Sequence, residues 1–367
     1  MFDPAEKVQQ YEGIFSEFPP KTPTAGEPDG PLFGNGDTGV TVGGKGDELT
    51  FWLSKNDFWR AYPKVVCNEA RRTGVKGLAT LKIRSDLLKN AAFSARQKIK
   101  TADVELDLRA GESHLHVSAY APYQQSMVVL RLTAEKGSIP LSIRLEPLED
   151  SDAESSCLTE GNILSITKEY TGEELDWESR ASAVCRILEW QENKGVLREG
   201  ETLTLVITVY TDHDTPNYRE LCRTEACGVT PELLEQYRAA HLSWWHAFWE
   251  TSGVSIPSEP EVEKFWYASH YLMACCCKTG KFAPGIFGNW ITTNFPAWLG
   301  DYHLNYNYEA PWWGVFSSNK VFLADPYDQP LLDYIPKARE NARKELGCRG
   351  IYSQVGIGPK GLAVRTY

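Results

Sequence analysis

Several large classes of protein are excluded by what this sequence of 367 residues lacks. It has no dense run of Lys and Arg, and its formal net charge of −11 opposes the phosphate-neutralising surface of a nucleic-acid-binding protein. No apolar run approaches the roughly 20 residues of a membrane-spanning helix. The first residues, MFDPAEKVQQ, contain neither the basic nor the apolar segment of a secretory signal. We therefore expect a cytoplasmic protein with no nucleic-acid or membrane partner.

Metal and cofactor motifs are also missing. The nine cysteines include no C-x-x-C pair, so the run at 275–277 is predicted to be core thiols of an apolar helix. His114 and His116 could face one side of a strand as two zinc ligands, but no third ligand accompanies them. GNGDTG, residues 34–39, matches the dinucleotide motif G-x-G-x-x-G but leads into strands, so we predict glycine turns. With no G-x-S-x-G nucleophile either, the sequence predicts neither a metal nor a cofactor.

Aromatic residues are what the sequence has in excess, with 12 Trp, 17 Tyr and 14 Phe. The chain is otherwise of ordinary globular composition, with 42% hydrophobic and 24% charged residues. Indole and phenol rings suit the C–H faces of sugar rings, and their polar atoms tolerate a wet cleft. A large, well-packed core would give the same composition, so a sugar site and a plain core both stay open.

The spacing of apolar residues changes once along the chain. Up to about residue 212, segments such as ELTFWLS, DVELDLRA and ETLTLVITVYTD alternate apolar and polar residues, which predicts an antiparallel β-sandwich. After residue 229 the spacing becomes helical, and Thr230 and Pro231 have the character of an N-cap and a first helical residue. A further helical pattern runs from about residue 327 to residue 346.

The clearest helical pattern lies between these two. The spacing of Ser258 and Glu261 is that of a capping box, and Gly280 can end the helix. Its predicted apolar face consists of Val262, Phe265, Trp266, Ser269, Leu272, Met273 and Cys276.

These patterns predict a β-sandwich domain at residues 1–212, a helical linker at 213–257 and a partial helical domain at 258–367. Helices with such apolar faces need partners, so we expect the helical domain to be truncated.

One aromatic segment, WLGDYHLNYNYEAPWW at residues 298–313, carries two asparagines two positions apart. Asn305 and Asn307 would diverge on a helix but point to the same side of an extended backbone. Joint action therefore requires an extended segment at least through Asn307. An amide does not titrate, so the pair could position a water but could not act as its base.

The order of a β domain, a linker and a helix leading into KFAPGIFGNWITTNFPAWLGDYHLNYNYEAPWW resembles glycoside hydrolase family 95. Residues 31–59 are similar to the family's opening, PGIFGNW to the motif before its catalytic loop, and DYHLNYN to its asparagine-x-asparagine motif. That family contains inverting α-L-fucosidases and α-L-galactosidases built as a β-sandwich, a linker and an (α/α)6 toroid. The resemblance implies that residues 258–367 are the first helices of a truncated (α/α)6 toroid. It also implies that Asn305 and Asn307 bind the attacking water.

Two departures limit this resemblance. The family continues from the asparagine pair into a Met-Asn-Tyr-Trp run, whereas this chain has YEAPWW, so fucose specificity stays open. The family's general acid, a Glu, and its water-assisting carboxylate lie later in the toroid, so no position of this chain inherits either role. Inversion needs an acid on one face of the sugar and a base across a water on the other. We expect this chain to hold the water and lack the acid.

The remaining site residues are predicted from their positions around the asparagines. Asp301 and Glu309 could orient Asn305 or contact sugar hydroxyls, and a structural role for Glu309 is equally consistent with the sequence. Further sugar contacts are predicted at Trp290, Trp298, Tyr302, His303, Trp312 and Trp313, with at least two of the tryptophans expected in the core.

The leading prediction is an inverting glycoside hydrolase that acts on a terminal α-linked sugar of an oligosaccharide or glycoside, with L-fucose or L-galactose as the first guess. Another six-hairpin glycosidase, a glycoside phosphorylase or a non-catalytic carbohydrate-binding protein are the alternatives. Linkage and oligomeric state do not follow from the sequence.

Overall fold

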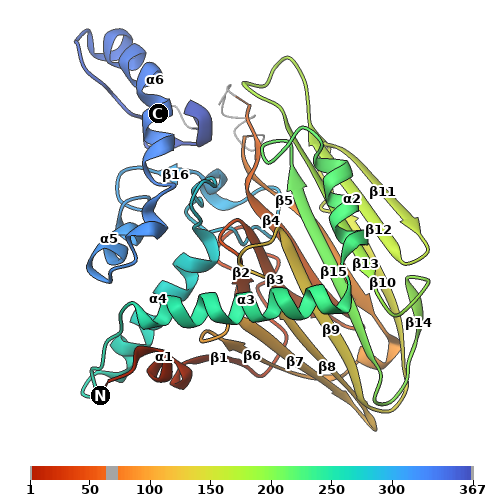
Figure 1. The fold of residues 1–367 in the computed structure, drawn as a ribbon. Helices are drawn as coiled ribbons and strands as arrows, with labels where there is room; N and C mark the ends of the chain where they lie inside the picture. The colour runs from red at the N-terminus through yellow and green to blue at the C-terminus, as the bar shows by residue number, and fades with distance from the viewer. Residues whose placement is uncertain (1, 63–72, 365–367) are drawn as a thin grey trace.

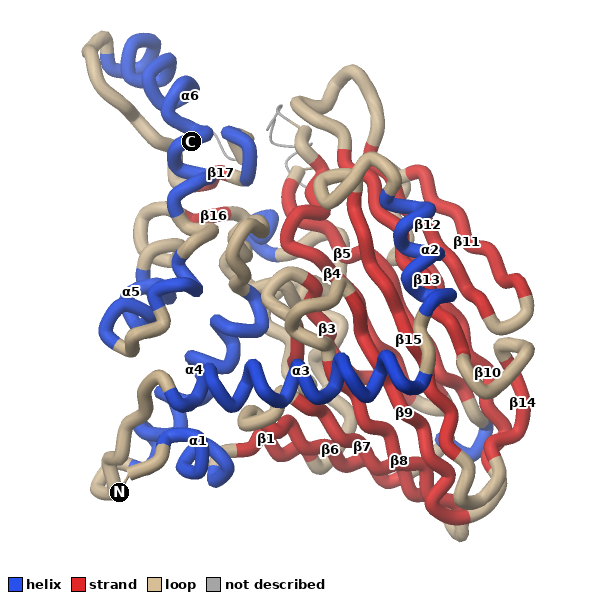
Figure 2. Tube along the Cα trace, viewed as in Figure 1, coloured by secondary structure: helices blue, strands red, loops and turns tan. Residues whose placement is uncertain are grey.

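The computed structural model describes residues 2–62 and 73–364, and its N-terminal half is a sandwich of two antiparallel sheets (Figures 1 and 2). The larger sheet consists, in spatial order, of β1 (Glu12–Phe15), β6 (Ala92–Lys98), β7 (Asp103–Ala110), β8 (Ser113–Tyr120), β9 (Met127–Lys136), β15 (Thr202–Thr211), β13 (Ser179–Ile187), β12 (Ile163–Tyr170) and β11 (Glu154–Glu160). The smaller sheet consists of β14 (Lys194–Leu197), β10 (Ile139–Pro147), β5 (Gly74–Arg84), β4 (Glu48–Arg60), β3 (Thr38–Lys45) and β2 (Leu32–Gly34).

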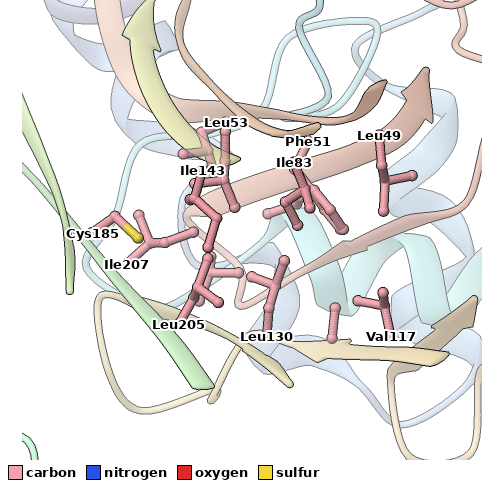
Figure 3. Close-up of a cluster of buried hydrophobic side chains, with 14 of the residues drawn as sticks. Leu49, Phe51, Leu53, Ile83, Val117, Leu130, Ile143, Cys185, Leu205 and Ile207 are labelled. Carbon is pink, nitrogen blue, oxygen red and sulfur yellow. The ribbon is translucent and has the colours of Figure 1, made fainter. Parts of the chain in front are cut away.

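Alternate side chains of the strands fill the space between the two sheets. Figure 3 shows Leu130 and Leu205 of the larger sheet facing Leu53 and Ile83 of the smaller one, and all four are at most 1% exposed. Burying a side chain of this size contributes about 1.5–3 kcal/mol. The period-two alternation therefore predicted the sandwich correctly, since the apolar set of each strand faces inward.

The helices follow the last long strand. They are α2 (Tyr218–Gly228), α3 (Pro231–Glu250), α4 (Pro260–Cys276), α5 (Ala310–Ser317) and α6 (Asp328–Leu346), preceded near the N-terminus by the short α1 (Pro4–Lys7). Single 3₁₀ turns occur at η1 (Val8–Gln10), η3 (Asp86–Leu88), η4 (Ala297–Gly300), η5 (Val321–Ala324) and η6 (Pro359–Gly361). Figure 1 shows α2 and α3 lying over the larger sheet, with α4, α5 and α6 to one side of the sandwich.

Helix α3 begins as its sequence predicts. The Thr230 hydroxyl accepts a hydrogen bond from the Leu233 amide at 3.3 Å, and Pro231 occupies the first turn. Leu234 then packs with Val129 and Val206 on the outer face of the larger sheet. The helix thus carries the chain from the sandwich to the remaining helices.

The predicted ends of α4 are wrong. The helix begins at Pro260 without a side-chain cap, so Ser258 and Glu261 form no capping box. It ends at Cys276 and does not continue to Gly280, because the backbone becomes extended at Cys277 and leads onto the smaller sheet.

The predicted buried face of α4 is also wrong over its first two turns. Val262 and Phe265 are 54% and 66% exposed. The buried side is instead polar and aromatic, because the Glu263 carboxylate pairs with Lys7 Nζ at 2.7 Å and the Tyr271 hydroxyl donates to a backbone carbonyl. Partners from the N-terminal segment thus allow polar side chains to occupy the inner side of the helix.

The glycine motif at residues 34–39 joins the sandwich to the helices. A Cβ atom on Gly34 would lie 2.5 Å from the Cys275 carbonyl oxygen, and one on Gly39 would lie 2.0 Å from the Asn289 carbonyl oxygen. Only glycine allows this approach, because both opposing atoms belong to the backbone. The predicted glycine turn is present, with Gly36 at a φ of +89°, and it also serves as the contact surface for the end of α4.

Side-chain amides and an indole complete this contact. Asn56 Nδ2 donates to the carbonyls of Cys276 at 2.8 Å and Phe282 at 3.0 Å, and Trp290 Nε1 donates to the Phe33 carbonyl at 3.0 Å. The PGIFGNW loop is therefore bound to the edge of the smaller sheet by groups that satisfy otherwise buried carbonyls.

A buried charge cluster reinforces the same junction. Lys55 is fully buried, and its Nζ lies 2.8 Å from Asp37, 2.7 Å from Asp57 and 3.0 Å from Asp214. Lys281, which follows α4, pairs with Asp214 at 2.5 Å. Burial and the two neighbouring carboxylates outweigh the attraction of Lys55 and raise the pKa of Asp57 to about 6.

The close approach at Gly39 can be tested by adding one methyl group. Gly39→Ala forces a Cβ against a backbone oxygen, so we expect the free energy of unfolding to fall by about 1–3 kcal/mol. Gly26→Ala is the matched control, since a Cβ there meets no atom within 4 Å. Urea denaturation should separate the two variants, and equal stabilities would contradict the close approach.

The pKa of Asp57 gives a pH dependence with a definite sign. It rises from 3.8 to about 6 on folding, so the folded state binds an extra proton in that range and loses relative stability as the pH increases through it. Asp57→Asn cannot titrate, so its free energy of unfolding should decline less than that of the wild type between about pH 4.5 and pH 7. The exposed Asp86→Asn variant is the control and should keep the wild-type profile. Identical profiles for Asp57→Asn and the wild type would contradict the assignment.

Candidate functional site

The asparagine segment leads from a short two-stranded sheet into α5. β16 (Tyr302–His303) pairs with β17 (Gly356–Ile357), and the Leu304 amide donates to the Val355 carbonyl at 2.8 Å. This antiparallel pair connects the start of the segment to the chain beyond α6.

Joint action of the two amides would require an extended backbone through Asn307, and the structure does not have one. Extension ends at His303, and residues 304–309 form turns closed by hydrogen bonds from Tyr308 N to His303 O at 2.9 Å and from Glu309 N to Tyr306 O at 3.0 Å. Asn305 and Asn307 are both exposed on these turns. The alternation of a strand therefore does not align their side chains.

A cavity of about 480 Å³ lies beside the second asparagine. It is enclosed by the C-terminal half of α4, the PGIFGNW loop, the start of α5 and residues of the N-terminal segment. Three of the predicted site residues line it, namely Trp290, Asn307 and Trp312. Most of its remaining wall is apolar and includes Leu272, Met273, Ile286 and Phe287.

The two cavity tryptophans are held rigidly. Trp290 is 5% exposed and donates its indole N–H to Phe33, while Trp312 is 3% exposed and packs edge-on against Tyr308 and Tyr327. Both are therefore mainly core residues, each presenting a small part of its ring to the cavity. This agrees with the expectation that at least two of the tryptophans are core.

A strained turn precedes the asparagines. Trp298, Leu299 and Gly300 have φ values of 51°, 62° and 61°, a left-handed conformation that costs a residue with a side chain about 1 kcal/mol or more. The turn brings the half-exposed Trp298 ring onto His303, with ring centroids 5.1 Å apart. Buried Asp301 lies 3.1 Å from His303 Nδ1 and, as a carboxylate, accepts a hydrogen bond from it, which fixes the orientation of the imidazole.

The other predicted contacts divide between the interior and the surface. Tyr302 is fully buried and donates to the Ala283 carbonyl at 2.8 Å, so its hydroxyl and ring serve packing and cannot reach a sugar. Glu309 and Trp313 are exposed. The structure thus separates the Trp298–Asp301–His303 group from the cavity that contains Asn307.

One residue of the cavity wall was not predicted from the sequence. Glu27, an exposed residue of the N-terminal segment, lines the cavity together with Asn307. It is the only carboxylate among the described residues of the cavity wall. No motif surrounds it, and it lies 280 positions from Asn307 in the chain, so only the folded structure brings the two together.

The candidate metal motifs have structural roles. His114 Nε2 and His116 Nδ1 both lie within hydrogen-bond distance of one Asp107 oxygen, at 2.6 and 3.2 Å. Within residues 2–62 and 73–364 no group of three or more His, Cys, Asp or Glu is arranged to hold a metal. The cysteines at 275–277 are buried free thiols, as predicted.

None of the helices in the described part of the chain has the length and hydropathy to span a bilayer.

Comparison with known proteins supports the family resemblance for the second part of the chain. Residues 252–359 match the glycosyl hydrolase family 95 catalytic domain. "Probable alpha-fucosidase A" of Aspergillus niger is 30% identical over 93 residues, which are 25% of this chain and 12% of the fucosidase. The predicted resemblance to family 95 is confirmed for this region, which includes both asparagines.

The whole chain also has a relative in fold. A solved structure titled "Putative kojibiose phosphorylase from human microbiome" superposes with a TM-score of 0.64 at 14% identity, covering 96% of this chain and 51% of that one. The superposed region covers about half of that protein, and the 93 aligned residues cover about an eighth of the fucosidase. The superposition shows a shared fold, and the family match supports the predicted resemblance to a glycoside hydrolase at residues 252–359. Neither comparison tests the predicted extent of the toroid.

The strained turn before the asparagines can be tested with two glycines of similar conformation. A Cβ on Gly300 would lie 2.4 Å from Val75 Cγ1, whereas one on Gly280, at a φ of +74°, meets no atom within 4 Å. Both alanine variants incur the left-handed penalty, but only Gly300→Ala adds the steric clash. In chemical denaturation, we expect the free energy of unfolding of Gly300→Ala to be about 1–3 kcal/mol lower than that of Gly280→Ala. Equal values would argue against tight packing of this turn.

Proposed function

We propose that this chain supplies the sandwich and the water-binding part of a glycoside hydrolase that releases a terminal α-linked sugar with inversion. The observation that carries the proposal is the match to the family 95 catalytic domain over residues 252–359, which includes both asparagines. The cavity beside Asn307 is the location we assign to the sugar.

L-Fucose is the sugar that the cavity wall favours. A 6-deoxy sugar carries a methyl group where L-galactose carries a hydroxymethyl group. Leu272, Met273, Ile286 and Phe287 offer this group apolar contact and few hydrogen-bonding partners. The parts of the Trp290 and Trp312 rings that line the cavity offer the same sugar further apolar contact.

The asparagines act on the water. In this proposal Asn307 and Asn305 fix the position of the attacking water through their amide groups while a carboxylate accepts its proton. The two exposed amides lie on adjacent turns, and side-chain rotation is needed for both to reach one water. Inverting enzymes place their two carboxyl groups roughly 6.5–9.5 Å apart. Glu27 is one carboxylate at the cavity, and the second must come from outside its described lining.

The proposal predicts that removal of either amide slows turnover. Asn305→Ala and Asn307→Ala should each reduce kcat by roughly 10²-fold, the usual effect of removing one positioned polar group. The substrate is 2,4-dinitrophenyl α-L-fucoside, because its phenolate leaves without help from a general acid. Asn217→Ala removes an exposed asparagine whose side chain caps no helix, so it is the matched control and should keep wild-type turnover. Wild-type rates in both site variants would refute the role of the asparagines.

The same assay separates the alternatives. Turnover that depends on added inorganic phosphate would indicate a phosphorylase. Saturable fucose binding without turnover, lost in Trp312→Ala, would indicate a carbohydrate-binding protein. Hydrolysis with retained configuration, followed by NMR of the released sugar, would contradict inversion.

A further inference from the structure

A second and larger depression, of about 1070 Å³, lies on the outer face of the smaller sheet. Its floor is formed by β4 and β5, one wall by residues 18–23 of the N-terminal segment and the other by residues 146–149 at the end of β10. It shares no lining residue with the cavity beside Asn307. We refer to it as the sheet groove.

The floor of the sheet groove carries polar groups without protein partners. Thr50, Trp52 and Thr80 are 6%, 7% and 5% exposed. Trp52 lies directly opposite Thr80 in the β4–β5 register, and Thr50 lies opposite Lys82. Among the described residues none is hydrogen-bonded to the two hydroxyls or to the indole N–H. These polar atoms are not among the enclosed side-chain atoms that lack a partner. They therefore reach the open space of the groove and are available to hydrogen-bond to a ligand.

The ring of Trp52 is fixed in place by the sheet. A Cβ on Gly43 would lie 3.0 Å from Trp52 Cζ3 and 3.6 Å from the Thr22 methyl carbon. The absence of a side chain at Gly43 therefore leaves the space that the ring of Trp52 occupies.

Both walls of the groove are held by hydrogen bonds. On one side the Thr22 hydroxyl donates to Asp29 at 2.9 Å. On the other, the Leu148 amide donates to the Leu78 carbonyl at 3.0 Å, and the Leu148 carbonyl accepts from Asn294 at 3.2 Å. A groove that is formed before the ligand arrives avoids the entropy of ordering its walls.

The charges at the groove argue for a neutral ligand. Glu146 is held between Lys82 at 2.6 Å and Arg144 at 3.3 Å, and Arg144 also pairs with Glu48 at 3.0 Å. The two lysines and three glutamates that line the groove sum to a formal charge of −1, and Arg144, which pairs with Glu48 and Glu146, brings the local sum to 0. Such a surface has no excess positive charge to attract phosphate or carboxylate ligands, and it offers fixed partners to hydroxyl groups.

We propose that the sheet groove binds a neutral oligosaccharide, independently of the proposed catalytic site. Sugar hydroxyls would pair with Thr50, Trp52, Thr80 and the Lys82–Glu146 ion pair, while the proline-rich wall at residues 18–23 contacts the C–H faces. The volume lies just above the range of roughly 300–1,000 Å³ that is usual for small-molecule sites, so it accommodates several sugar residues.

The test follows the Trp52 indole signal in ¹H–¹⁵N NMR spectra of the full chain, with Trp52→Phe to assign it. The probes are linear gluco-, manno- and xylo-tetrasaccharides, with a hyaluronan tetrasaccharide as the anionic comparison. We expect at least one neutral probe to shift the signal saturably. The double variant Thr50→Val, Thr80→Val should weaken that binding about tenfold, as two lost hydrogen bonds would.

Two further variants separate loss of hydroxyls from loss of structure. Thr80→Ser keeps the hydroxyl and should bind as the wild type does. Thr133→Val removes a threonine hydroxyl from the larger sheet, which is paired with Thr202 at 2.9 Å, and should also bind normally. The proposal is overturned if no neutral probe shifts the Trp52 signal at about 20 mM, if only the anionic probe does, or if binding survives in the double valine variant.

Discussion

The contact between the glycine motif at 34–39 and the end of α4 is the constraint on which the rest of the structure depends. Gly34 and Gly39 bring the backbone of the smaller sheet against the carbonyls of Cys275 and Asn289 at distances that any side chain would prevent. This contact fixes where α4 ends and where the PGIFGNW loop begins. The loop and the helix then form two walls of the cavity beside Asn307.

Charge burial at the same junction favours one arrangement of the chain over others. Lys55 satisfies three aspartates only when the turn before β3, the strand β4 and the segment after β15 are correctly placed, and Lys281 adds the segment after α4. A buried charge left without a partner costs several kcal/mol. Misplacing any one of these segments is therefore penalised, although the cluster itself adds little net stability compared with an apolar core of the same size.

The sequence predicted those features that depend on neighbours along the chain. Strand alternation and the capping of α3 by Thr230 are local, and both are present. The inward face of α4 depends on Lys7, which lies more than 250 residues away in the chain. The spacing of apolar residues along the helix contains no information about such a distant partner. The approach of Glu27 to Asn307 was not predicted for the same reason, since the two residues are 280 positions apart. The turns at 304–309 are closed by local hydrogen bonds, which the spacing of apolar residues does not reveal.

The glycine contact also limits motion. Side chains at an interface can change rotamer and let two parts of a protein slide or hinge, but a contact made between backbones has no such freedom. The sandwich and the start of the helical part should therefore move as one rigid body. A ligand on the outer face of the smaller sheet would therefore keep a constant position relative to α4, whatever the side chains around it do.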